Sequence, residues 1–123
     1  MDDITFERLV AEAVDSLPEE FKAKLDNVEV IIEDLPSMRQ LAMLGLRHPL
    51  QLFGLYQGIP KTKRGGNYTF VVPDKITIFK IPIVYFYRTP EAIKQKVKAV
   101  VLHEIGHHFG MSETDLARRP KAQ

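Results

Sequence analysis

The last third of the chain carries the signals of one long, buried helix. Thr89, Pro90 and Glu91 form a typical helix start: threonine caps the first turn, proline takes the first helical position and an acid follows. Residues 99–102 are all apolar, so the middle of this helix is expected to be buried rather than to lie on the surface. The helix is predicted to end at Gly110. The other elements must therefore cover this helix on more than one side.

An HExxH pattern lies near the end of this predicted helix, formed by His103, Glu104 and His107. Residues four apart in a helix stand one turn above another, so both imidazoles project to one side and can bind one zinc ion. Glu104 is rotated away from the two histidines, yet it stays close enough to act as the general base that takes a proton from water. A metal site is therefore favoured over two histidines that only pack or meet solvent.

A catalytic zinc site of this kind needs a third protein ligand. Gly110 follows His107 by three residues, and a glycine there lets the chain leave the helix in a left-handed turn and fold back toward the metal. Glu113, ten positions after His103, has the spacing of a third ligand and is predicted to supply it, with Asp115 as the alternative. Two histidines and one carboxylate would leave the fourth position of the tetrahedron for water.

Four other side chains that could take part in chemistry are interpreted as structural. His108 is turned about 100° around the helix from the second histidine of the motif, so it is expected to pack or to support the site. His48 is expected to be an ordinary loop histidine. Tyr85 and Tyr87 could stabilise an oxyanion, but aromatic packing is the favoured interpretation.

The composition narrows the possible functions. A chain of 123 residues fits one domain, predicted to span residues 1–123. The net charge is only +1, and the basic cluster at residues 61–64 is interpreted as a solvated loop, so no nucleic-acid partner is expected. There are no cysteines, which leaves histidine and carboxylate as ligands for zinc. The acidic start is unlike a signal peptide and no apolar run approaches a membrane span, so no membrane partner and a cytoplasmic location are predicted.

Hydrophobic periodicity and turn residues predict a mixture of helices and strands. An amphipathic helix is expected at residues 4–17, followed by a short second helix to about Leu25 that a capping box between Ser16 and Glu19 would open. A short helix or irregular connection is expected at residues 36–47, and residues 81–88 are ambiguous. Strands are predicted at residues 28–32, 50–56, 69–72 and 75–80.

With these motifs in place, the chain resembles the small bacterial zincin-like metallopeptidases, or mini-zincins, whose motif is HExxHxxGxxD. The resemblance spans nearly the whole chain. It rests on four motif residues and three outer stretches: His103, Glu104, His107 and Gly110, then Leu17-Pro18, Gly-Leu-Tyr-x-Gly at 54–58 and Pro-Asp-x-Ile-Thr at 73–77. Where that motif has aspartate, this chain has Glu113, which keeps the charge and adds a methylene group.

The resemblance implies an α+β fold, with a small twisted mixed sheet packed against N-terminal helices and a C-terminal metal-binding helix. Similar folds bind an extended peptide along an edge strand, and residues 75–80 are expected to form that strand. The implied function is zinc-dependent hydrolysis of a peptide or protein substrate, with Glu104 as general base. One alternative is a non-catalytic zincin-like module for peptide binding or regulation, and another is a structural domain whose metal only stabilises the fold.

Overall fold

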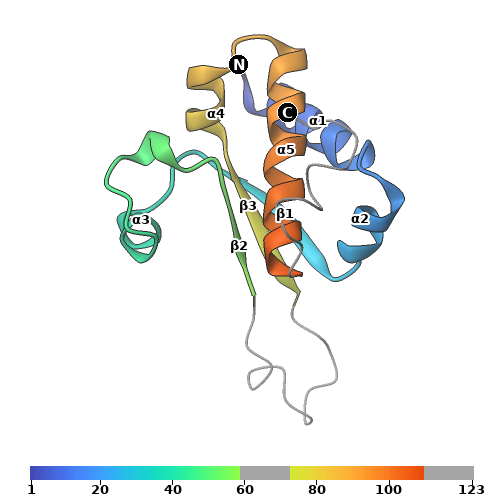
Figure 1. Ribbon diagram of the computed structural model, residues 1–123. Coiled ribbons are helices and arrows are strands. Elements are labelled where there is room, and N and C mark those ends of the chain that lie inside the picture. The colour runs from blue at the N-terminus through green and yellow to red at the C-terminus, as the bar shows by residue number, and fades with distance from the viewer. Residues whose placement is uncertain (59–72, 110–123) are drawn as a thin grey trace.

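The computed structural model describes residues 1–58 and 73–109. In this part of the chain, a three-stranded mixed sheet with strand order β1-β3-β2 packs against helices, as Figure 1 shows. The α+β class and the mixed sheet predicted from the sequence are confirmed. The strand predicted at 69–72 and the candidate ligands Glu113 and Asp115 lie outside the described residues.

Two helices form the N-terminal part, α1 (Asp3–Asp15) and α2 (Glu19–Lys24). Asp2 caps α1, accepting a hydrogen bond from the Thr5 backbone N–H at 2.9 Å, and hydrogen bonds from Thr5 hold the pKa of Asp2 below its usual value. The predicted capping box at Ser16 is wrong. The Ser16 hydroxyl donates to the Ala13 carbonyl at 2.8 Å and closes α1, while Pro18 stands at the N-cap of α2.

The sheet has β3 (Asp74–Phe79) at its centre, parallel to β1 (Val28–Glu33) and antiparallel to β2 (Gly54–Gln57). Residues 76–79 are buried on both faces, which is typical of a central strand. The expectation that residues 75–80 form the edge strand is therefore wrong. The strand at the edge beside the motif helix is β2, as its contacts with α5 show.

Two short helical segments connect β1 to β2, α3 (Met38–Met43) and the 3₁₀ helix η1 (Pro49–Gln51), and a third, α4 (Lys80–Phe86), connects β3 to the C-terminal helix. Gly45 ends α3 with a φ of 70°, while Leu46 N–H bonds to the Leu41 carbonyl at 2.9 Å, the Schellman arrangement that favours glycine. The strand predicted at 50–56 is thus shorter than expected, because its first residues form η1. The ambiguous segment at 81–88 is mainly the helix α4.

The long helix predicted at the C-terminal end is α5 (Pro90–His108), capped by Thr89, whose hydroxyl accepts from Ala92 N–H at 3.1 Å. It contacts α1, α2, α4, β2 and β3, so its middle is buried as expected. The core consists of large apolar side chains from α1, α2, the sheet and α5, among them Phe6, Phe21, Ile76, Ile78, Val101 and Ile105. Within the described residues, no helix is both long enough and apolar enough to span a membrane.

Candidate metal centre

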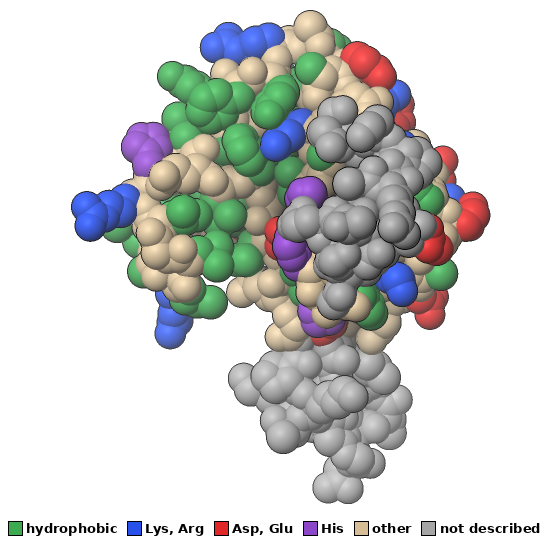
Figure 2. Space-filling view, in the orientation of Figure 1, with side chains coloured by type: hydrophobic (Ala, Val, Ile, Leu, Met, Phe, Trp, Pro, Cys, Tyr) green, Lys and Arg blue, Asp and Glu red, His purple; other side chains and the backbone are tan. Residues whose placement is uncertain are grey.

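The two histidines of the motif lie on one face of α5, one helical turn apart. Both side chains are exposed, and the His103 and His107 ring centroids are 5.8 Å apart with the rings nearly perpendicular. Figure 2 shows histidine side chains at the surface near this end of the helix, with hydrophobic side chains exposed to one side of them. A helix places residues at i and i+4 in this way, so the pair is ready to ligate one ion from a single direction.

Glu104 lies between these histidines but turns toward β2. Its side chain is half-buried, and its Oε1 accepts a hydrogen bond of 2.9 Å from the Tyr56 backbone N–H. Burial raises the pKa of Glu104 above its ordinary value, against the Tyr56 hydrogen bond and the two histidines, which lower this pKa. The carboxylate is therefore both held in place and made more basic, which are the properties of a general base.

A second polar group joins β2, β3 and the end of α5. The Tyr56 hydroxyl donates to Asp74 Oδ2 at 2.8 Å, and His108 Nε2 lies 3.8 Å from the same oxygen. The Tyr56 and His108 rings stack with centroids 3.9 Å apart. His108 thus packs against the strand that holds Glu104 and does not face the metal side of the helix.

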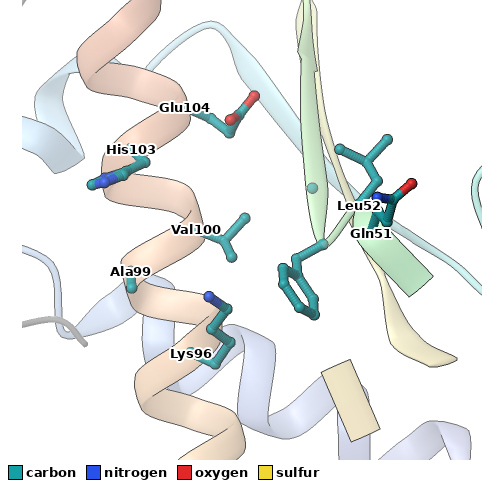
Figure 3. A pocket seen from close by; sticks show the side chains of 9 residues that line it. Gln51, Leu52, Lys96, Ala99, Val100, His103 and Glu104 are labelled. Carbon is teal, nitrogen blue, oxygen red and sulfur yellow. The ribbon is translucent and has the colours of Figure 1, made fainter. Parts of the chain in front are cut away.

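A pocket of about 300 Å³ lies between α5 and residues 51–54, next to the motif. Figure 3 shows its two walls. Lys96, Val100 and Glu104, four residues apart, follow one another along the helix, with Leu52 and Gln51 across the space. Phe53 also lines the pocket. Gly54 brings β2 close to the helix: a Cβ added there would lie 2.4 Å from Val100 Cγ1. His103 and Glu104 of the motif are among the residues that line the pocket.

A comparison with protein-family profiles matches residues 25–122 to the family described as zincin-like metallopeptidase. The chain belongs to this family. A search of curated proteins found no match. The matched segment contains the sheet, the pocket and the whole of α5, so the family assignment covers the elements that build the site.

The side chains of this zincin-like metallopeptidase fit two positions of a zinc site. Imidazole nitrogen is a preferred zinc ligand, and the His103 and His107 rings stand side by side on an exposed helix face, next to a carboxylate. Among residues 1–58 and 73–109, no group of three histidine, cysteine or acidic side chains gathers as a complete metal site. The predicted third ligand Glu113 and its alternative Asp115 lie outside these residues, so this part stays a prediction.

His48, Tyr85 and Tyr87 contact neighbouring residues of the fold and lie outside the motif. His48 caps η1, because its Nδ1 accepts from the Leu50 N–H at 3.1 Å. The Tyr87 ring meets Phe53 edge to face, and Tyr85 meets Phe86 in the same manner. The interpretation of Tyr87 as a packing residue agrees with its contact and with its place against the core. Tyr85 is 53% exposed, as is its neighbour Phe86 at 54%, so its interpretation as a packing residue stays a prediction.

Four residues that shape the site were not singled out from the sequence: Gly54, Tyr56, Asp74 and Lys96. Gly54, Tyr56 and Asp74 lie in the stretches at 54–58 and 73–77 that carried the resemblance, so a signal for them was present. Lys96 precedes His103 by seven residues, which is two helical turns, and this spacing could have placed it on the motif side of the helix.

Proposed function

We propose that this protein is a zinc-dependent peptidase in which His103, His107 and Glu113 bind the metal and Glu104 is the general base. The observation that supports this most is the position of Glu104, which lies between the two helix histidines in sequence while its Oε1 is held by the Tyr56 N–H at 2.9 Å. Bound zinc would supply a Lewis acid that polarises the scissile carbonyl and makes water more acidic.

The residues of the chain then account for the proton steps. Glu104 takes a proton from the attacking water and passes it to the leaving amine, which is the usual general acid–base sequence. Because the Tyr56 N–H holds one carboxylate oxygen, the carboxylate keeps one orientation through both transfers. Its partial burial favours proton uptake, because the charged carboxylate is less well solvated there than in water.

The proposed substrate is an extended peptide that adds to the edge of β2 that faces away from β3. Since the Tyr56 N–H bonds to Glu104 and not to β3, Tyr56 belongs to the residues whose backbone groups point away from the sheet. The backbone groups of Gly54, two residues earlier, then point the same way, because this direction alternates from one strand residue to the next. A peptide placed there would pass the pocket and the motif histidines together.

The first test measures zinc content and peptide cleavage in the same preparations, made without a histidine tag. We expect about one zinc per chain in the wild type and loss of this zinc in the His103→Ala/His107→Ala double variant. The Glu104→Gln variant should keep zinc and lose cleavage by about 100-fold or more, since glutamine cannot take the proton. Glu7→Gln on α1 removes the same charge from an exposed position and is the control.

The main alternative is a zincin-like module that binds peptides without cleaving them. The edge strand β2 and its adjacent pocket would serve this function equally well. In that case Glu104→Gln would leave peptide binding nearly unchanged and no variant would show cleavage to lose. Cleavage by Glu104→Gln at the wild-type rate would refute the proposed general base.

A further inference from the structure

The pocket beside the motif ends at an ammonium group. Lys96 lines it together with apolar side chains, and in Figure 3 the lysine nitrogen lies below Val100. This nitrogen stands over the Phe53 ring, which also lines the pocket. We propose that this pocket binds a carboxylate carried on an apolar stem, so that the peptidase selects peptides with an acidic group next to the scissile bond. The inference rests on the proposed function and adds a substrate class to it.

The walls suit the stem of such a group. Phe53, Leu52, Ala99 and Val100 supply most of the lining, and about 300 Å³ is at the small end of the range for ligand pockets. That space suits one amino-acid side chain better than a larger ligand. Along the helix wall, Glu104 and Lys96 lie at opposite ends with Val100 between them, while Gln51 lies beside Leu52 on the other wall. A side chain with apolar methylenes and a charged tip matches the order of groups along the helix wall.

The Lys96 ammonium is held by aromatic rings. Its Nζ lies 4.5 Å from the Phe53 ring centroid and 5.4 Å from the Tyr87 ring centroid. Lys94 on the same helix instead pairs with Glu12 and Glu91. Within the described parts of the chain, no carboxylate forms such a pair with Lys96. The rings orient the cation without neutralising its charge, which leaves it able to bind an anion.

The two charges along the pocket set the direction of binding. Lys96 and Glu104 are eight residues apart on α5, about 12 Å along the helix axis, with Val100 between them. An acidic ligand is repelled from the Glu104 end and attracted to the Lys96 end. The acidic group therefore enters away from the general base and does not compete for the proton positions.

The carboxylate could belong to a glutamate or aspartate side chain or to the C-terminus of a peptide. The cleavage experiment uses a peptide mixture incubated with the zinc-loaded protein, with cut sites read by mass spectrometry. Three peptides then separate a side-chain carboxylate from a C-terminal one. Two are amidated, with glutamate or glutamine at the position that the mixture identifies, and the third has glutamine there and a free C-terminal acid. We expect an acidic peptide to be cleaved about tenfold faster than its neutral match, as one charge-assisted contact would give.

Variants at Lys96 decide whether this preference comes from the pocket. Lys96→Met keeps an apolar stem and should bring the ratio to about one, while Lys96→Glu should favour lysine at the same position. Lys98→Met is the control, because it loses the same charge but lies about 200° around the helix and does not line the pocket. An acidic preference unchanged in Lys96→Met, or absent from the wild type, would overturn the inference.

A binding experiment keeps the inference separate from catalysis. ¹⁵N-labelled wild-type and Lys96→Met proteins are titrated with acetylated, amidated Ala-Glu-Ala and Ala-Gln-Ala and with acetylated Ala-Gln-Ala acid. Tighter binding of an acidic peptide, seen at amides of residues 51–54 and 96–100 and lost in Lys96→Met, supports the pocket even where nothing is cleaved. Such binding without any cleavage would contradict the proposed hydrolysis and leave the pocket assignment in place. Equal binding of all three peptides would refute the pocket assignment, whatever the cleavage result.

Discussion

At the scale of single residues, Glu104 combines burial with charge, and this conflict predicts a dependence of stability on pH. Its pKa is raised in the folded, metal-free protein because burial disfavours the carboxylate. The fold therefore binds this proton more tightly than the unfolded chain does. The stabilising contribution is complete below the unfolded pKa and is lost as pH rises through the folded pKa.

We therefore expect metal-free Glu104→Gln to be at least as stable as the wild type at about pH 7, and to lose less stability between about pH 4 and about pH 7. Urea unfolding at several pH values in the presence of a chelator measures this, with Glu7→Gln as the control for surface charge. A variant less stable than the wild type near neutral pH would contradict the raised pKa. The expected result would also show that lost cleavage in Glu104→Gln does not come from unfolding.

At the scale of elements, the distance between β2 and α5 positions the site. The absent Cβ of Gly54 makes this close approach possible, because an added Cβ would lie 2.4 Å from Val100 Cγ1 and 3.2 Å from the Thr77 carbonyl oxygen. A β-branched side chain such as Val100 has few rotamers with which to move away. The strand must then shift from the helix, and the Tyr56 N–H moves with it from Glu104.

Gly54→Ala is expected to destabilise the fold by about 1–3 kcal/mol through overpacking. Val100→Ala removes the clashing methyl, so the double variant should be less destabilised than the sum of the two single variants, by about 0.5–3 kcal/mol. Urea unfolding of the four proteins closes this double-mutant cycle. Additive effects would mean that the strand and helix do not meet at this point.

Local sequence signals predicted those elements whose stability depends on neighbours in the chain. The Thr89 cap, the buried α5 and the strand at β1 are confirmed, because caps and apolar patterns report local structure. The prediction that residues 75–80 form the edge strand was wrong, because β3 pairs with strands on both sides and its own residues do not indicate how many partners it has. The capping box predicted at Ser16 was wrong for a related reason: its hydroxyl bonds to the end of the preceding helix and does not cap the following one.

In the candidate site too, the features set by local spacing were predicted and those set by tertiary contacts were not. The spacing of His103 and His107 predicts a shared helix face, and the structure places both rings there. The Tyr56 N–H on Glu104 joins residues 48 positions apart, and the Lys96 pocket forms only when residues 51–54 pack on α5. Sequence spacing within one helix therefore predicts the histidine pair, while the groups that orient and surround it depend on tertiary contacts.

At the scale of the whole molecule, the core and the motif histidines occupy different parts of the fold. The core is built from α1, α2, the sheet and the buried face of α5, and neither His103 nor His107 belongs to it. His103 and His107 lie on the exposed face of the same helix. The apolar packing can therefore persist without metal, in contrast to small domains that fold only around zinc.

Chelation is accordingly expected to lower the unfolding temperature without unfolding the protein. Zinc that binds only the folded state adds a linkage term of about 2.7 kcal/mol when its free concentration is 100 times its dissociation constant. Circular dichroism before and after chelation should show the same helix content at room temperature, with a lower melting temperature that returns when zinc is added. The His103→Ala/His107→Ala variant should melt at one temperature in both conditions. Loss of helix on chelation of the wild type would contradict this expectation and favour the structural alternative, in which the metal holds the fold together.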